Sequence, residues 1–342
     1  MTVLEAARKI QGQIVAWRRE VHQNPELGLE TPMTEALVAG ALSDMGIEVR
    51  TGVGGHGVVG LLRGEGRQGS GPEEAATGAV VGTASGAATG AAAGRASGAT
   101  AGMAPVKTFA IRADMDALPV TEETGLSFAS KNPGRMHACG HDAHVAMLLG
   151  AAKILSDTKD KVHGNVKFIF QPGEEGPGGA QPMIRDGALE DPKVDAVIGA
   201  HVGPLWNVGV GQLGFRTGPM MAATDRFYVR IQGKGGHGAA PHFSVDPVVI
   251  AAQIVTSLQT IVSREVSPVA PAVVTVGIIR AGTAANIIPD YCEMNGTVRY
   301  LDEELASVMP KRIKEICEGI ASAMKGSATV QYAHGYPPLV ND

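Results

Sequence analysis

The sequence predicts an α/β protein of two domains, a larger one built on an open sheet and a smaller inserted one with the element order β-α-β-β-α-β. Short apolar runs alternate with segments of helical periodicity in the first part of the chain, and this order changes near Ala222. The length of 342 residues exceeds that of one typical domain, and 44% hydrophobic with 18% charged residues suffice to bury a core. We therefore expect domains at residues 1–221 and 222–333, with residues 334–342 beginning a return towards the first domain.

The N-terminus is predicted to form an amphipathic helix. Apolar residues recur at helical intervals and basic residues occupy the other faces, which is typical of a surface helix and unlike a signal peptide. The apolar positions are Leu4, Ala7, Ile10, Ile14, Trp17 and Val21. A second helix is expected to begin with Thr31 as its N-cap and Pro32 at its first position, and to end at Gly46 before a strand at residues 47–49.

Four apolar runs are predicted to form the other strands of the first domain. They cover residues 57–62, 108–113, 166–170 and 194–200. A helix that begins near Asp142, with apolar residues on one face, separates the second run from the third. Such βα alternation is typical of an open sheet, in which ligands usually bind at the carboxyl ends of the strands.

Residues 65–105 interrupt this pattern with a segment of Ala, Gly, Thr and Ser. Glycine recurs at every fourth position from Gly78 to Gly102, which could be a glycine ridge for helix pairing in a membrane. Only Val80 and Val81 are large and apolar, however, and each glycine costs a helix roughly 1 kcal/mol relative to alanine. We therefore favour a flexible surface insertion.

The smaller domain is expected to fold as strand, helix, strand, strand, helix, strand. The predicted elements cover residues 227–232, 247–264, 273–279, 293–300, 303–324 and 328–333. A small sandwich of this kind, inserted after a larger domain, is suited to act as a lid or as a dimer-forming module.

Charge and cysteine content limit the class of partner. The net charge of -5 and the absence of a long Lys/Arg run argue against nucleic acid, so a small molecule is the expected ligand. Cys139, Cys292 and Cys317 are too few and too scattered for a disulfide framework. We therefore expect a reducing compartment, the cytoplasm, and no membrane partner.

The densest group of metal-binding residue types lies at residues 136–144. Cys139 and His141 flank Gly140, and a thiolate and an imidazole on a loop that glycine allows to turn can converge on one cation. The alternative is a buried free cysteine among polar residues that cap a helix.

Two adjacent carboxylates follow the third apolar run. Glu174 and Glu175 lie in a loop rich in proline and glycine, and adjacent side chains normally point apart. One could then bind a metal while the other accepts a proton from water at that metal, as hydrolysis requires. The alternative is a solvated acidic turn.

Further polar groups follow the other predicted strands. His201 is the first strongly polar residue after the fourth run, and Asp114 and Asp116 follow the second, where strand alternation places both carboxylates on one side. One of them could orient a metal-binding imidazole. Because all these groups are delivered to one edge of the sheet, a shared metal centre is favoured over unrelated packing roles.

Several motifs are also similar to those of a known family. In order along the chain, they are RREVHQNPELGLE, IRADMDALPV, MHACGHDAHVAMLLGAA, FIFQPGEEGPGGAQPMI, GAHV and GKGGHGAAPH. They resemble the metallopeptidase-like amidohydrolases, which include hippurate hydrolase, indole-acetyl-amino-acid hydrolases and bacterial N-acyl-amino-acid deacetylases. The resemblance covers nearly the whole chain apart from the insertion, and it implies metal-dependent hydrolysis of the amide bond of N-acyl amino acids.

The resemblance implies a role for each candidate residue. It implies that a two-metal centre is bound by Cys139, His141, Glu175 and His201. Glu174 would be the general base that activates the bridging water, and Asp116 would orient the site from behind the ligands. The smaller domain would mediate homodimerisation, and substrate contacts would come from His237, Asn286 and Arg299. For Asn286 a turn residue and for Arg299 a surface ion pair are the alternatives.

The sequence does not decide which metal is bound or whether the chain supplies every ligand of the centre. A mixed thiolate, imidazole and carboxylate set accommodates zinc, manganese, cobalt or nickel. Members of the family continue further and carry another histidine ligand that has no match here, so we expect the larger part of such an enzyme. The alternatives are an inactive homologue that binds a metal or ligand, and a structural zinc module built around Cys139 and His141.

Overall fold

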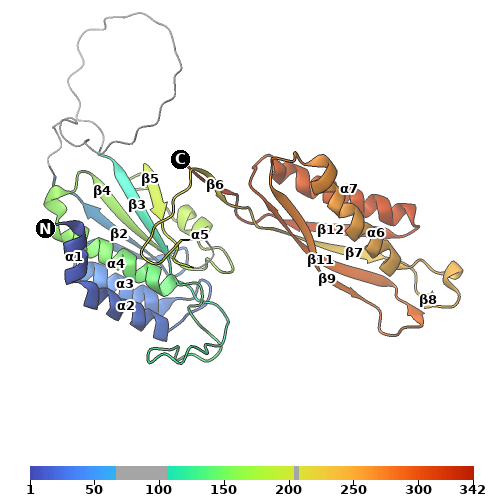
Figure 1. Cartoon of the computed structure of the whole chain (residues 1–342), viewed down its shortest axis with the longest axis horizontal. Helices are drawn as coiled ribbons and strands as arrows, with labels where there is room; N and C mark the ends of the chain where they lie inside the picture. The colour runs from blue at the N-terminus through green and yellow to red at the C-terminus, as the bar shows by residue number, and fades with distance from the viewer. Residues whose placement is uncertain (67–105, 204–207) are drawn as a thin grey trace, which may run out of the picture. The chain divides into compact units, whose positions relative to one another are not determined.

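The computed structural model of the chain describes residues 1–66, 106–203 and 208–342 (Figure 1). Contacts divide the chain into two compact units, Met1–Asn207 and Val208–Asp342, and each is described by itself. The domain boundary predicted at Ala222 lies within the second unit, directly after a short strand. The insertion predicted at residues 65–105 lies outside the described residues from position 67 onwards.

A five-stranded sheet forms the centre of the first unit. Its strands span Glu48–Val53 (β1), Gly57–Arg63 (β2), Thr108–Asp114 (β3), Asn165–Gln171 (β4) and Ala196–Gly199 (β5). In the order β1-β2-β4-β3-β5, β3 runs parallel to β4 and β5, whereas β2 is antiparallel to both of its neighbours. The α/β class is thus confirmed, and the carboxyl ends of β3, β4 and β5 meet at one edge.

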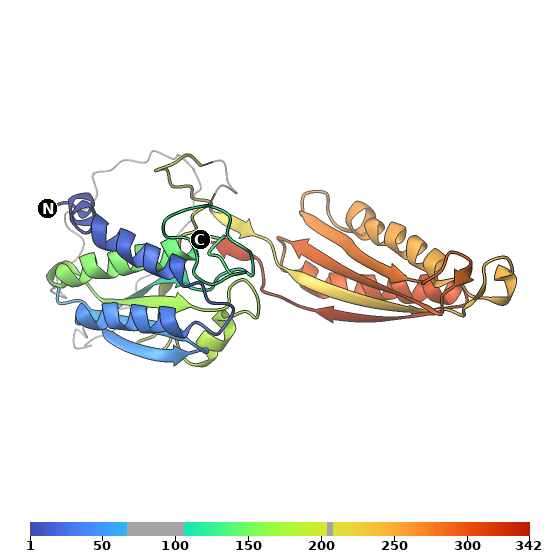
Figure 2. The same cartoon turned by 90° about the horizontal axis from the view of Figure 1, so that it is seen from below.

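Helices cover one face of this sheet, as Figure 2 shows for the three long ones. They span Val3–Lys9 (α1), Gln11–Gln23 (α2), Pro32–Asp44 (α3) and His141–Asp157 (α4). On the other face lies the short helix Ala180–Arg185 (α5), and a 3-10 turn spans Lys159–Lys161. The single N-terminal helix that we predicted is instead two helices. Ile10 leaves helical geometry (φ -100°, ψ 9°) and caps α1 through its own N–H, close to Gly12, which has a low helix propensity.

Alternation along the strands gives the unit a core on each side of its sheet. In β4, Val166, Phe168 and Phe170 face the helices, whereas Ile169 faces Met183 of α5. The larger core, between the sheet and α2, α3 and α4, also contains Val21, Val38, Leu42, Val58, Leu62, Val145 and Leu149. β4 is buried along its whole length, as expected for a central strand.

α3 begins at the predicted residue, but the group that caps it is not the predicted one. Thr31 is the N-cap and Pro32 the first helical residue, yet the Thr31 side chain makes no capping hydrogen bond. Instead, the carboxylate of Glu26 accepts the N–H groups of Met33 (3.0 Å) and Thr34 (2.9 Å). An acceptor from an earlier loop thus satisfies the helix terminus, which local sequence rules do not reveal.

The second unit confirms the predicted β-α-β-β-α-β order. Its main elements are Asp225–Gln232 (β7), Pro247–Thr260 (α6), Ala272–Ala281 (β9), Tyr291–Tyr300 (β11), Leu305–Ala323 (α7) and Ser327–Ala333 (β12). The strands form an antiparallel sheet in the order β12-β7-β11-β9. Both helices pack on one face of it around a single core that includes Phe227, Val229, Ile254, Leu258, Met294 and Ile313.

Within the described residues, one helical segment is long and apolar enough to span a membrane by length and composition. It covers Pro247–Glu265, that is α6 with the π-helical turn Ile261–Glu265. Ile250, Ile254 and Leu258 of this segment are buried in the core of the second unit, next to α7 and the sheet. Packing within the unit accounts for these three apolar residues, whereas Val248 and Val249 of the same segment are exposed.

Short pairs of strands complete the second unit. Gly218–Met221 (β6) pairs with Leu339–Asn341 (β13), and Gly236–His237 (β8) pairs with Ile287–Ile288 (β10); a 3-10 turn lies at Pro241–Phe243. The residues expected to begin a return towards the first domain thus pair with the segment by which the chain enters the second unit.

Candidate metal centre

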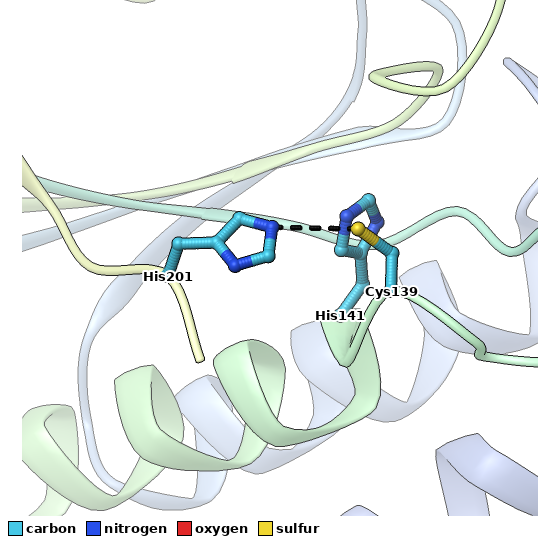
Figure 3. Close-up of side chains that lie close together, drawn as sticks. All are labelled: Cys139, His141 and His201. Carbon is cyan, nitrogen blue, oxygen red and sulfur yellow. Dashed lines mark hydrogen bonds between the residues drawn. The ribbon is translucent and has the colours of Figure 1, made fainter. Parts of the chain in front are cut away.

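The three parallel strands and α4 bring most of the predicted ligands to one edge of the sheet. Cys139 and His141 lie at the start of α4, and His201 follows β5. The Cys139 Sγ lies 3.4 Å from His201 Nε2, and one ligand atom from each of the three residues lies within 4.8 Å of the others (Figure 3). A thiolate and two imidazoles at this spacing form a group that can bind one divalent cation.

A second group shares His141 with the first. Ligand atoms of His141, Glu174 and Glu175 also lie within 4.8 Å of one another, and His141 Nε2 is 3.7 Å from Glu175 Oε1. Both of these atoms are buried and have no hydrogen-bond partner. Because buried polar atoms are almost always paired, two facing orphans fit a cation between them. The residues present therefore suit a two-metal centre.

Asp116 connects the histidine with the two glutamates. Its backbone carbonyl accepts a hydrogen bond from His141 Nδ1 (2.8 Å), which leaves Nε2 as the free ring nitrogen facing the cluster. Its carboxylate lies 3.6 Å from the same Nδ1 and accepts the N–H groups of Glu174 (2.8 Å) and Glu175 (3.0 Å). Asp116 thus orients the imidazole through its main chain and the glutamate loop through its side chain.

The start of α4 is held against two other elements. Gly140, the N-cap, has φ +87°, and a Cβ there would lie 2.6 Å from Val202 Cγ2, so glycine lets the loop turn and approach Val202 closely. In the first turn of α4, Asp142 Oδ2 accepts hydrogen bonds from Arg18 Nε (3.0 Å) and His22 Nδ1 (2.9 Å) of α2. The motif residues of α2 therefore anchor the helix that carries His141.

The pKa shifts indicate a site with an excess of negative charge. Burial, followed by the hydrogen bond and charge of Glu175, raises the pKa of Cys139 to about 12. Burial and then the charge of Glu175 also raise the pKa of Glu174 above its usual value. Burial and the neighbouring His144 lower the pKa of His201, which favours the neutral form of this imidazole. A cation would offset these carboxylates and favour the thiolate form of Cys139.

Two residues of the cluster were not among the predicted ligands. Asp114 at the end of β3 and His144 in α4 are buried, and their side chains lie 2.6 Å apart at His144 Nδ1. Burial opposes ionisation of Asp114, but the hydrogen bond from His144 and the charge of Arg112 hold its pKa below the usual value. His144 follows His141 by three residues and therefore lies on the same face of the helix, a spacing from which its position could have been found.

The predicted substrate residues all lie in the second unit. His237 of β8 pairs with Ile287, and the carbonyl of the adjacent Asn286 accepts the N–H of Gly238 (2.8 Å), so His237 and Asn286 are neighbours. Arg299 lies near the other end of β11, where it donates to Thr297 Oγ1 and to the carbonyl of Val298. At about 3.4 Å per residue, roughly 27 Å of strand separates it from Tyr291. The unit thus brings two of the three together.

Comparisons with known proteins agree with this geometry. The profile of peptidase family M20/M25/M40 matches residues 110–342. The chain is 41% identical to the N-acyl-L-amino acid amidohydrolase of Geobacillus stearothermophilus, with 97% of this chain and 79% of that protein covered. It is 40% identical to the N-acetyl-L-cysteine deacetylase of Bacillus subtilis, with 97% and 70% covered.

A solved structure agrees with the metal-binding interpretation. The Bacillus subtilis YXEP protein, described as a dinuclear metal binding peptidase of the M20 family, superposes with a TM-score of 0.74 at 32% identity. The alignment covers 98% of this chain and 77% of that one. From the family match, the identity to these relatives and the two ligand groups that share His141, we conclude that the chain belongs to peptidase family M20/M25/M40 and is a metal-dependent hydrolase.

Proposed function

We propose that the protein hydrolyses the amide bond of N-acyl amino acids, with N-acetyl or N-benzoyl groups as the first candidates, to release a carboxylic acid and a free amino acid. The observation that carries the proposal is the pair of ligand groups joined at His141, with the carboxylate of Glu174 beside them. The names of the amidohydrolase and deacetylase relatives support this class of substrate.

Two divalent cations are the proposed cofactors, bound by Cys139, His141, Glu175 and His201. Zinc, manganese, cobalt and nickel all suit a mixed sulfur, nitrogen and oxygen ligand set. Such cations supply Lewis acidity, which makes water more acidic and polarises a carbonyl group. Their ligands come from a unit with its own core around Phe168 and Leu149, so we expect a chelator to remove activity before it unfolds the protein.

Glu174 is the proposed general base. Its backbone is held by Asp116, while its side chain is exposed at the cluster and within reach of His141. Its raised pKa brings the carboxylate closer to the pKa range in which it can accept a proton from water and return it to the leaving amine. Glu175 keeps a buried carboxylate oxygen directed at His141. The two adjacent glutamates can therefore divide base and ligand roles.

The second unit is proposed to recognise the substrate and to form a homodimer. His237, Asn286 and Arg299 are the proposed substrate contacts, with the imidazole and amide for the acyl carbonyl and the guanidinium for the carboxylate of the amino acid. We further propose that the protein acts in the cytoplasm.

The test is the variant Glu174→Gln, assayed on N-acetyl- and N-benzoyl-amino acids with metal content measured in parallel. The variant keeps its shape and its bond to Asp116 but no longer has a basic carboxylate, so we expect turnover to fall about 10²- to 10⁴-fold with metal content unchanged. The matched control is Glu123→Gln, at an exposed glutamate for which we assign no role. Full activity of Glu174→Gln would rule out its role, and metal binding without turnover in the unaltered protein would rule out the proposed reaction.

A further inference from the structure

We propose that His144 is a positioning residue that holds His201 in place by binding the backbone of Val202. The inference rests on the proposed function in one respect, that His201 is a metal ligand. His144 itself lies behind the ligands, with 2% of its surface exposed, and has no role in the proposed reaction.

A continuous chain of hydrogen bonds leads from β3 to the loop after β5. Arg112 Nη1 donates to Asp114 Oδ2 (2.7 Å), and Asp114 Oδ1 lies 2.6 Å from His144 Nδ1. The N–H of Val202 then donates to His144 Nε2 (2.8 Å). Because an amide N–H can only donate, Nε2 must be the acceptor, and the ring proton must lie on Nδ1 facing the Asp114 carboxylate. The partners on both sides therefore select one neutral tautomer of His144.

Val202 transmits this constraint to His201. The Val202 carbonyl lies 2.7 Å from His201 Nδ1, which donates to it and so leaves Nε2 as the nitrogen facing Cys139 Sγ at 3.4 Å (Figure 3). The Val202 side chain lies against Gly140 of the Cys139 loop. The N–H of Val202 thus binds His144, its carbonyl binds His201, and its side chain packs on Gly140. With Nδ1 bound to this carbonyl, His201 directs Nε2 towards the cluster.

The loop that carries His201 needs such an anchor. β5, the preceding strand, has four residues, lies at the edge of the sheet and is exposed along its length. Packing of β5 therefore does little to fix the residues that follow. His144, in contrast, lies in the buried first part of α4, which packs beside β3. The position of His201 is therefore restrained by α4, through His144, more than by β5.

A competing interpretation is that Asp114, His141 and His144 form another cation site, since their ligand atoms also lie within 4.8 Å of one another. Both ring nitrogens of His144 and both oxygens of Asp114 already have hydrogen-bond partners, however. A cation at His144 would have to displace either the Asp114 contact or the Val202 N–H. The observed contacts favour a positioning role.

Two variants distinguish the hydrogen bond at Nδ1 of His144 from the one at Nε2. In His144→Asn, an amide group near the position of Nδ1 can still donate to Asp114 but cannot reach the N–H of Val202. In His144→Gln, the carbonyl oxygen lies near the position of Nε2 and can still accept that N–H. The test compares both variants with the unaltered full chain. The quantities to measure are the Co²⁺ affinity by calorimetry, the cobalt–thiolate absorption of Cys139 and the hydrogen exchange of the Val202 amide.

We expect His144→Asn to weaken Co²⁺ binding about 10- to 100-fold, as loss of a group that orients a ligand typically does, while His144→Gln stays within a few-fold of the unaltered protein. The Val202 amide should exchange at least about tenfold faster in His144→Asn only, which a general loss of stability would not produce at one amide. Unaltered affinity and exchange in His144→Asn, or equal losses in both variants, would overturn the inference. None of these measurements uses substrate, so a protein that binds Co²⁺ but cleaves no N-acyl amino acid would refute the proposed function and leave this test intact.

Discussion

Replacing Asp116 by asparagine should loosen both glutamates of the centre at once. Asp116 has 1% of its surface exposed, and its two carboxylate oxygens each accept one backbone N–H, from Glu174 and from Glu175. Asparagine has the same shape but offers only one acceptor oxygen, and its amide nitrogen would face the second N–H as another donor. One of the two contacts must therefore be lost, whichever way the amide turns.

The expected loss of metal affinity follows from that one lost hydrogen bond. A hydrogen bond to a charged acceptor contributes about 1.5–3 kcal/mol, and a buried donor left without a partner costs a similar amount unless the loop moves to reach water. Groups that orient metal ligands typically change affinity 10- to 100-fold, which corresponds to about 1.4–2.7 kcal/mol. Both routes indicate that Asp116→Asn weakens metal binding by one to two orders of magnitude.

Calorimetric titration with Mn²⁺ or Co²⁺ and urea denaturation of the metal-free protein test this expectation. The matched control is Asp195→Asn, because Asp195 also accepts a backbone N–H, from Thr108 at 2.8 Å, but does so at the opposite end of β3 and with an exposed carboxylate. Metal affinity of Asp116→Asn within twofold of the unaltered protein, or an equal loss in the control, would refute the reasoning.

Two further predictions concern stability away from the metal centre. The hydrogen bond to Glu35 raises the pKa of His56, so this pair stabilises the fold below the usual histidine pKa near 6.5 and loses its effect as the pH rises through the raised value. The urea stability gap between the unaltered protein and His56→Gln should accordingly be larger at pH 6 than at pH 9, and a gap independent of pH would contradict this. In the second unit, Asp225→Ala should cost about 2–5 kcal/mol, because the hydroxyl groups of Tyr300 (3.0 Å) and Tyr332 (2.8 Å) lose their common acceptor. Tyr332→Phe, which removes only one of these bonds, should cost about 1 kcal/mol, and metal affinity should stay unchanged in both variants.

Most elements of the fold could be predicted because their periodicity is a local property of the chain. Along β4, Val166, Phe168 and Phe170 enter one core and Ile169 the other, as the alternation of side chains along a strand predicts, and α4 buries one apolar stripe. The break at Ile10 and the capping of α3 by Glu26 were not predicted. Both depend on competition between hydrogen-bond partners, which local propensity describes only weakly.

The antiparallel pairing of β1 and β2 was likewise a result of the tertiary structure. The runs at residues 47–49 and 57–62 were predicted as strands, but periodicity does not state the direction in which strands pair. The parallel trio β3, β4 and β5 follows from the helical crossovers between them, and this trio positions the metal centre.

The sequence by itself determined which residue types were available for a metal centre: a cysteine and a histidine around Gly140 before a helix, and a pair of glutamates and His201 after strands. Only the tertiary structure decided which atoms meet. Cys139 and His201 are 62 positions apart in the chain yet their Sγ and Nε2 atoms are 3.4 Å apart in space, and His144 accepts the N–H of Val202, the residue after His201. The physical reason is that side-chain chemistry is encoded residue by residue, whereas the distance between two ligands is set by the packing of the elements that carry them.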